Sequence, residues 1–386
     1  MNVVDMHCDT ISEILKYRRQ GKTCGLRRNE LHVDLERMKQ GGYMLQNFAL
    51  FVDIGACGGS PETGGAVTDA EITLPPKKGE ENRGNGAGSP WDEVCALYEV
   101  YREELAANAD ILAPVYSFAD IQANQMTGKM QSLLTVEEGA VCQGELAKLE
   151  HLYEMGVRMM TLTWNYPNEL GYPNMNSERG KVVWAQCRRL REGRCTERER
   201  AQIQAALTRY LCVPDTENGL TERGREFLDR MECLGMIVDV SHLSDAGFYD
   251  VLQYSSKPFV ASHSNAREIC GCVRNLTDDM IRKLGERGGC MGLNFCADFL
   301  ELKPAGEENP GTIQAVVRHA KHIVNTGGLE VLGLGSDFDG IDTHRELPGA
   351  QSMEHLWDAL HEAGFTESQL DHIFGGNVLR VYREVL

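Results

Sequence analysis

Histidine and carboxylate side chains follow directly on several short apolar runs of this sequence. His7 and Asp9 come at the end of the run VVDM, and they point to the same side of an extended chain because successive side chains alternate. Four further runs lead into a residue of the same kind, namely Glu137, His242, His263 and Asp337. One His-x-Asp pattern is weak evidence, since most such tripeptides are exposed polar strand ends. The same arrangement after five runs indicates that these side chains share a site.

Imidazoles and carboxylates together form a donor set that suits zinc or a similar divalent ion. A carboxylate placed between two histidine-containing sets can bridge two ions, which is the arrangement of a binuclear hydrolase. Each residue alone also has an ordinary interpretation, because a lone histidine is commonly a surface residue and Glu137 or Glu138 can begin a helix. The ordinary interpretation does not explain the recurrence on five strands. We therefore expect two divalent metal ions, with Zn²⁺ as the best match.

Short β-prone runs alternate with helical patterns along the chain, which predicts parallel strands joined by helices. The expected strands cover residues 3–6, 44–51, 132–136, 157–163, 236–240, 258–262, 290–295 and 331–335. Helices are expected near residues 10–20, 32–40, 91–108, 144–155, 221–233, 244–254, 277–287, 312–326, 351–363 and 366–386. Eight strands with intervening helices are typical of a (β/α)8 barrel of the TIM type, although an open doubly wound sheet gives a similar pattern. We expect the barrel, an α/β fold in which all C-terminal strand ends open on one mouth.

Residues 1–386 are expected to form one barrel domain with two insertions. Residues 55–90 are rich in glycine, proline and charge, which predicts a surface loop, with a lid as the sharper alternative. Residues 186–217 follow the fourth expected strand. We interpret them as a charged segment with a solvated arginine face, followed by a short helix.

The composition, with 42% hydrophobic and 25% charged residues, is that of a folded protein with a substantial core. A net charge of −18 makes nucleic acid and anionic membrane surfaces poor partners, so we expect a small-molecule substrate and leave a homodimer open. The first residues lack the features of a secretory signal, and no run approaches the ~18 apolar residues of a membrane span, so we expect a cytoplasmic protein. The 13 cysteines include no CxxC pair, which argues against a zinc ribbon or a disulfide framework.

A resemblance to a known family runs from end to end of the chain. It is carried by the segments VDMHCDT, LLTVEEGA, GMIVDVSHLSD, FVASHSNAR, RNLTDD, LGSDFDG and GGNVLRV. The specific part is VDVSHLSD followed by SHSNAR, and the His-x-Asp and GSDFDG patterns support it. These segments resemble the membrane (renal) dipeptidases, which are zinc peptidases within the amidohydrolase group of metal-dependent barrels.

The resemblance implies a ligand for each metal ion. His7 and Asp9 would bind one zinc ion, and His242 and His263 would bind the other. Glu137 would bridge the two ions. It is preferred over the next glutamate because it matches the family's glutamate directly after the valine of the strand.

The resemblance also casts Asp337 as the acid–base residue and Arg274 as the anchor for the carboxylate of the substrate. The planar fork of a guanidinium matches a carboxylate. One position departs from the family, because Trp164 stands where the family commonly carries a histidine that binds the substrate carbonyl and the oxyanion. An indole donates a hydrogen bond but cannot carry charge, so Trp164 is expected either as a wall of the pocket or as an oxyanion donor, with Asn165 as a substitute donor.

The chain is therefore expected, by resemblance, to be a zinc-dependent dipeptidase that hydrolyses dipeptides with a metal-bound hydroxide. A related amidohydrolase acting on N-acyl amino acids, lactams or phosphoesters is one alternative, and Arg274 favours the amino-acid-like substrates among these. A catalytically silent barrel that binds metal or peptide is another, because of Trp164. The intact ligand set and Asp337 argue against the silent barrel.

Overall fold

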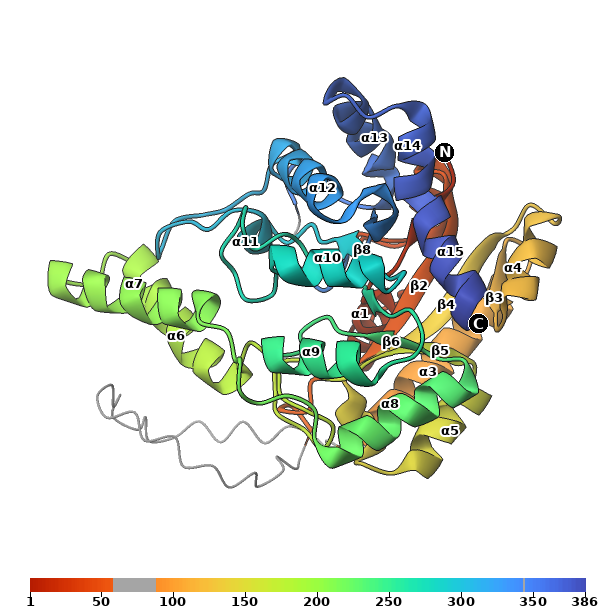
Figure 1. Cartoon of the computed structure of the whole chain (residues 1–386), viewed down its shortest axis with the longest axis horizontal. Helices are drawn as coiled ribbons and strands as arrows, with labels where there is room; N and C mark the ends of the chain where they lie inside the picture. The colour runs from red at the N-terminus through yellow and green to blue at the C-terminus, as the bar shows by residue number, and fades with distance from the viewer. Residues whose placement is uncertain (58–87, 343) are drawn as a thin grey trace.

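The computed structural model describes residues 1–57, 88–342 and 344–386, and within them the strands form one parallel sheet that closes into a barrel surrounded by helices (Figure 1). The strands are β1 Val3–Asp5, β2 Tyr43–Phe51, β3 Leu112–Val115, β4 Met130–Glu137, β5 Val157–Thr161, β6 Ile237–Asp239, β7 Val260–Ala261, β8 Cys290–Leu293 and β9 Leu332–Leu334. Their order is β2-β1-β9-β8-β7-β6-β5-β4-β3, and the pairing of β2 with β4 closes the barrel without β3. The predicted (β/α)8 barrel is confirmed.

The helices surround this barrel (Figure 1). They are α1 Thr10–Arg19, α2 Leu35–Gln40, α3 Pro90–Ala107, α4 Phe118–Gln125, α5 Leu146–Glu154, α6 Ser177–Arg191, α7 Glu197–Cys212, α8 Glu222–Leu234, α9 Asp245–Tyr254, α10 Asp278–Glu286, α11 Ala297–Leu300, α12 Ile313–Gly327, α13 Met353–Glu362, α14 Glu367–Asp371 and α15 Asn377–Val385. Several begin at a side-chain cap, as at Ser89, whose hydroxyl accepts from the Asp92 amide while the Asp92 carboxylate accepts from the Ser89 amide. Among the described residues, no helix combines the length and apolar character that crossing a membrane requires.

Outside the arginine-rich insertion, one strand and two helices of the structure, β3, α4 and α11, are absent from the sequence-based prediction. The strand has only four residues, LAPV, and it pairs with the first half of β4, while β5 pairs with the second half. Pro114 lacks the amide hydrogen that an interior strand donates, and it is tolerated because β3 lies at an edge. A short run interrupted by proline has no strand signal of its own, which explains why the sequence pattern missed it.

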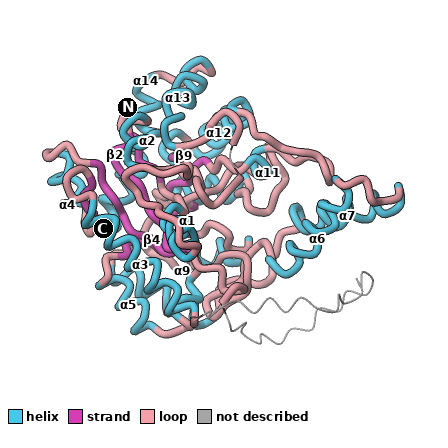
Figure 2. Tube along the Cα trace, turned by 180° about the vertical axis from the view of Figure 1, so that it is seen from behind, coloured by secondary structure: helices cyan, strands magenta, loops and turns pink. Residues whose placement is uncertain are grey.

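The arginine-rich insertion also differs from its expected form. Instead of a charged segment and a short helix, it contains α6 and α7, which have 15 and 16 residues and project from the barrel (Figure 2). Their buried residues recur at helical spacing, with Val183, Cys187 and Leu190 on α6 and Ile203 and Leu207 on α7. Arginine has a high helix propensity, so the charge that suggested a solvated segment is compatible with these helices. In the other expected insertion, residues 58–87 lie outside the described residues.

The C-terminal helix α15 covers the beginnings of the barrel strands. Its residues Val378, Val381 and Tyr382 form one buried cluster with side chains near the N-terminal ends of the strands, including Val4 and Ile237. The barrel is thus packed at this end, and the opposite end carries the loops that follow the strands. This arrangement places the polar strand ends of the sequence analysis at the open mouth.

Removing one hydroxyl from this packed end should destabilise the whole barrel. Tyr382 donates its hydroxyl to Asn47 Oδ1 at 3.0 Å and accepts from Asn47 Nδ2 at 2.7 Å, and both residues are buried. We expect Tyr382→Phe to lower the free energy of unfolding by about 1–3 kcal/mol, because the Asn47 amide loses its partner. Urea denaturation measures the change. Tyr254→Phe, at a half-exposed tyrosine, is the control, and equal stabilities of the two variants would contradict the assignment.

Candidate metal centre

The structure brings all six expected residues together at the mouth of the barrel. His7 and Asp9 follow β1, and Glu137 is the last residue of β4. The remaining three follow β6, β7 and β9, and they are His242, His263 and Asp337. All six side chains are buried. Five separate strands therefore deliver nitrogen and oxygen donors to one small volume.

Glu137 stands at the centre of this cluster. Its Oε2 lies 3.4 Å from Nε2 of His7, while its Oε1 lies 3.0 Å from Nε2 of His242 and 3.5 Å from Nε2 of His263. Asp9 Oδ2 is 3.3 Å from the same His7 nitrogen. One carboxylate thus has its two oxygens directed at two different sets of side chains.

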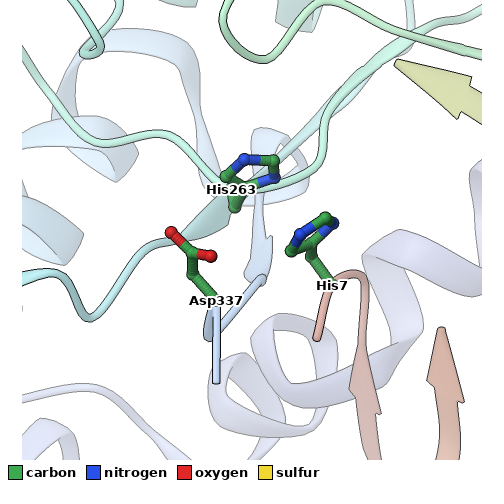
Figure 3. Close-up of side chains that lie close together, drawn as sticks. All are labelled: His7, His263 and Asp337. Atoms are coloured by element: carbon green, nitrogen blue, oxygen red, sulfur yellow. The ribbon is translucent and has the colours of Figure 1, made fainter. Parts of the chain in front are cut away.

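Three groups in the cluster bring their possible ligand atoms close enough together to hold a metal ion. They are His7 with Asp9 and Glu137, then Glu137 with His242 and His263, and finally His7 with His263 and Asp337. Within each group the ligand atoms lie within 4.8 Å of one another. Figure 3 shows the third group, with the His7 and His263 rings stacked at 4.0 Å between centroids and the Asp337 carboxylate beside them. Glu137 belongs to both of the first two groups, which is the position of a bridging ligand.

The hydrogen bonds behind two of the imidazoles determine which nitrogen faces the site. Nδ1 of His242 lies 2.9 Å from Oδ1 of Asn165, so this nitrogen donates and Nε2 keeps its lone pair. Nδ1 of His263 lies 2.7 Å from the Ser262 hydroxyl, whose proton is donated to Asp239 at 2.6 Å. The hydroxyl therefore accepts from Nδ1 of His263, and Nε2 of this ring also keeps its lone pair.

The two lone pairs face each other. Nε2 of His242 and Nε2 of His263 are 2.9 Å apart, and both lie near the carboxylate of Glu137. Burial is the main cause that lowers the pKa of His242 to about 4 and that of His263 well below its ordinary value, with the Arg274 charge acting in the same direction. Both rings are therefore neutral, as metal ligation requires. Unprotonated nitrogens at this separation repel each other, and a cation between them would remove the repulsion.

The charged groups on the other side of Glu137, His7 and Asp9, also favour a bound cation. Burial alone would raise the pKa of Glu137, but the nearby His7 charge holds it well below its usual range. Burial would lower the pKa of His7, yet the carboxylates of Glu137 and Asp9 raise it well above the ordinary value. Among the described residues, Nδ1 of His7 and Oδ1 of Asp9 are buried without a hydrogen-bond partner. Clustered carboxylates and unsatisfied donors of this kind fit a divalent cation.

Asp337 lies beside the cluster in a left-handed backbone conformation, with φ of 63°. Its Oδ2 accepts a 2.8 Å hydrogen bond from Nδ2 of Asn294, a residue that sequence reasoning missed. Burial is the main cause that raises the pKa of Asp337 to about 7, and the carboxylates of Asp9 and Glu137 add to it. A carboxyl group with a pKa near neutrality can both accept and release a proton.

Arg274 is buried next to His263 and has unused hydrogen-bonding capacity. Its Nη2 donates to the His263 carbonyl at 3.3 Å, and its guanidinium carbon lies 5.4 Å from the centroid of the Phe299 ring. Its Nε has no hydrogen-bond partner among the described residues, and the guanidinium forms no ion pair there, although the Asp337 charge acts on it against the effect of burial on its pKa. A buried guanidinium without an anionic partner is costly, so this position favours an anionic ligand.

Trp164, Asn165 and Glu138 form the side of the mouth next to His242. The Trp164 ring is partly buried, 4.8 Å from the Phe51 ring and 6.2 Å from the His242 ring between centroids. Asn165 contacts the Nδ1 face of His242 as described above. The Glu138 carboxylate points into the loop after β5, where it accepts from the Trp164 amide at 3.2 Å and from Asn168 Nδ2 at 2.6 Å. Glu138 is therefore outside the three ligand groups, and it holds the loop that carries Asn165.

The supporting residues were not predicted, although the sequence contained a signal for them. Asp239 and Ser262 stand inside or at the end of apolar runs, close before His242 and His263. A carboxylate or hydroxyl within an otherwise buried strand must find a partner, because burying it alone costs free energy. Such residues mark positions that orient a neighbouring ligand.

The sequence of this chain matches known proteins over most of its length. Residues 1–183 and 201–386 match the family model of the membrane dipeptidases, peptidase family M19. The chain is 29% identical over 299 residues to an uncharacterised protein in the pqqA 5′ region of Klebsiella pneumoniae, which covers 77% of this chain and 98% of that protein. It is 31% identical over 268 residues to an uncharacterised dipeptidase of Schizosaccharomyces pombe, which covers 68% of this chain and 55% of that protein. The chain thus spans about half the length of the fission-yeast protein.

Two solved structures share the fold. The metallopeptidase called dipeptidase AC, of family M19, superimposes with a TM-score of 0.77 at 24% identity and covers 100% of this chain and 98% of its own. A Rhodobacter sphaeroides metallopeptidase, liganded with a phosphinate mimic of the dipeptide L-Ala-D-Ala, has a TM-score of 0.76 at 23% identity, with coverages of 100% and 99%. Since the family model matches nearly the whole chain, the protein belongs to the membrane dipeptidase family, peptidase family M19.

Proposed function

We propose that this protein is a zinc-dependent dipeptidase that uses two metal ions. The observation that carries the proposal is the carboxylate of Glu137, whose two oxygens face two separate sets of nitrogen and oxygen donors. Family membership supports the proposal, as does the phosphinate mimic of a dipeptide in the Rhodobacter sphaeroides structure.

His7 and Asp9 would hold one ion, His242 and His263 the other, and Glu137 both. When bound, the two ions supply Lewis acidity for the peptide carbonyl and lower the pKa of a water molecule toward neutrality. The hydrogen bonds to Nδ1 of His242 and of His263 keep the opposite nitrogens deprotonated and fix the orientation of the rings.

The remaining residues bind the dipeptide and move the proton. We assign Asp337 to accept a proton from the attacking water and deliver it to the leaving amine, with Asn294 holding its carboxylate in place. Arg274 binds the C-terminal carboxylate of the substrate, which supplies the anion that its buried position lacks. Trp164 forms a wall of the pocket, and Asn165 acts through His242 rather than as an oxyanion donor.

An N-acyl amino acid hydrolase is the second candidate. Arg274 favours it equally, because N-acyl amino acids also carry a free carboxylate. The two candidates differ in the group on the other side of the scissile bond, which is a free amine in a dipeptide and an acyl chain in the alternative.

A substrate panel with the metal-loaded and the metal-free protein tests the function directly. We expect the zinc-loaded enzyme to hydrolyse dipeptides, to cleave N-acetyl amino acids far more slowly, and to lose activity on chelation until zinc is restored. Metal analysis of the loaded protein should give two ions per chain. Hydrolysis of N-acyl amino acids alone would favour the second candidate, and no hydrolysis of either class would leave a metal-binding barrel without this activity.

Asp337→Asn should separate proton transfer from metal binding. The amide keeps the shape of the side chain but removes the base, so turnover should fall by about 10²–10⁴-fold while two ions remain bound. Steady-state kinetics and metal analysis measure the two quantities.

Asp339→Asn is the matched control for this variant. The Asp339 carboxylate is buried but accepts from the Thr10 hydroxyl and the His32 amide, each at 2.6 Å. Its replacement should lower Tm and leave turnover per folded molecule near that of the wild type. Normal turnover in Asp337→Asn would remove Asp337 from the mechanism.

Arg274→Ala should weaken the binding of free dipeptides much more than the binding of C-terminally amidated dipeptides. A charged hydrogen bond contributes about 1.5–3 kcal/mol, so KM for free dipeptides should rise about ten- to a hundredfold. The amidated dipeptides serve as the internal control, because they lack the group that Arg274 binds. If the wild-type enzyme cleaves both forms equally well, Arg274 does not recognise a carboxylate.

A further inference from the structure

A cavity of about 340 Å³ lies between the α6–α7 pair and the segment after β8. Trp184 and Cys187 contribute from α6, Cys296 and Asp298 from the segment after β8, and Asp342 from the loop after β9. These three segments follow the C-terminal ends of β5, β8 and β9, so the cavity lies on the same face of the barrel as the metal centre. Its volume is within the range of small-molecule pockets.

One residue separates this cavity from the acid–base carboxylate. The Cys296 amide donates to Oδ1 of Asn294 at 2.6 Å, and Nδ2 of Asn294 donates to Asp337 at 2.8 Å. Burial raises the pKa of the Cys296 thiol well above its ordinary value, and the nearby carboxylates of Asp337 and Asp298 raise it further. Cys296 therefore lines the cavity and bonds through its amide to the residue that holds the catalytic carboxylate.

The lining combines apolar walls with an excess of negative charge. The apolar part comes from side chains such as Leu207 and Leu211 of α7. The charged groups are four carboxylates and two bases, namely Asp298, Glu307, Glu308, Asp342, Arg191 and Lys303. Lys303 pairs with Glu301 at 3.0 Å. Arg191 is therefore the one unpaired base among the described lining residues that faces the four carboxylates. A flexible apolar stem with a cationic end is the side-chain type that such a cavity accommodates.

We propose that this cavity is a subsite for a substrate side chain, and that Asp298 makes it select a long side chain ending in a cation, as in lysine or arginine. The inference rests on the proposed dipeptidase function. Asp298 is half-buried, and one of its oxygens accepts from Asn309 at 3.0 Å, which holds the carboxylate in place. The three α6 residues of the lining, Trp184, Cys187 and Arg191, lie within residues 184–200, outside the stretches matched by the family model. The insertion therefore supplies one wall of the cavity, whereas the selecting carboxylate Asp298 lies in a stretch that the family model matches.

Substrates that differ only in the terminal charge test the proposal on the wild-type enzyme. The zinc-loaded protein is assayed with Lys-Ala against norleucyl-alanine, and with Ala-Lys against alanyl-norleucine, using Ala-Ala as reference. We expect kcat/KM to favour lysine over norleucine by about tenfold or more at one of the two positions, as a charged interaction predicts. The position that shows the preference identifies which residue of the dipeptide enters the cavity.

Asp298→Asn should reduce the lysine-to-norleucine ratio toward one, mainly through KM for the lysine substrate. Asp342→Asn, at an exposed position of the same lining, should reduce the ratio less, and it keeps the test available if Asp298→Asn folds poorly. Glu197→Gln is the matched control, because it removes one exposed carboxylate from α7 without touching the cavity, and it should keep the wild-type ratio.

The outcomes distinguish the subsite from the function on which it rests. Cleavage of Ala-Ala with equal kcat/KM for lysine and norleucine at both positions would overturn the subsite and leave the dipeptidase. A lysine preference that survives unchanged in Asp298→Asn and in Asp342→Asn would overturn the role of these carboxylates. Failure to cleave any dipeptide would overturn the dipeptidase proposal itself.

Discussion

The buried carboxylate of Glu137 is the constraint on which the rest of the catalytic face depends. A charged carboxylate deep in a barrel is tolerated only where cations or hydrogen-bond donors surround it on every side. His7, His242 and His263 approach it within 3.0–3.5 Å, and each comes from a different strand. No single loop could supply these groups from so many directions. The closed parallel sheet does so because every strand ends at the same mouth.

A second layer of buried carboxylates, Asp239 and Asp5, lies beneath the metal centre, and both make the same kind of hydrogen bond. Asp239 at the end of β6 accepts from the hydroxyl of Ser262 at 2.6 Å, and Ser262 directly precedes His263. Asp5 at the end of β1 accepts from the hydroxyl of Ser336 at 2.6 Å, and Ser336 directly precedes Asp337. In both cases a carboxylate on one strand fixes the residue before a functional side chain on the neighbouring strand. The free energy spent on burying these charges is offset by charge-assisted hydrogen bonds, and the result is a rigid placement of the groups above them.

The sequence predicts those parts of the fold and of the site that are determined by residues close together in the chain. It does not predict the parts that depend on contacts between distant residues. The eight barrel strands were visible because each is a short apolar run, and the six residues of the centre were visible because each follows such a run. β3 was missed because its role as an edge of β4 is a long-range pairing that the four residues LAPV do not encode. The choice between Glu137 and Glu138 also depends on distant residues, since the loop after β5 supplies the amide of Trp164 and the side chain of Asn168 that bind Glu138.

The α6–α7 pair shows how a rigid reaction centre can be combined with a separate source of selectivity. The centre rests on strand ends, where the barrel leaves little freedom, whereas the pair packs its own buried cluster against residues such as Val273 and Ala305. Cys272 and Val273 lie in that cluster, and the next residue is Arg274, so the packing of the insertion reaches the proposed carboxylate anchor. A change in the insertion would alter the proposed side-chain cavity and the packing next to Arg274, whereas the residues around Glu137 are held by the strand ends. Asn294 links the cavity to Asp337 through two hydrogen bonds, while the strand ends hold the residues around Glu137, so the proposed selectivity can vary with little effect on the placement of the reacting groups.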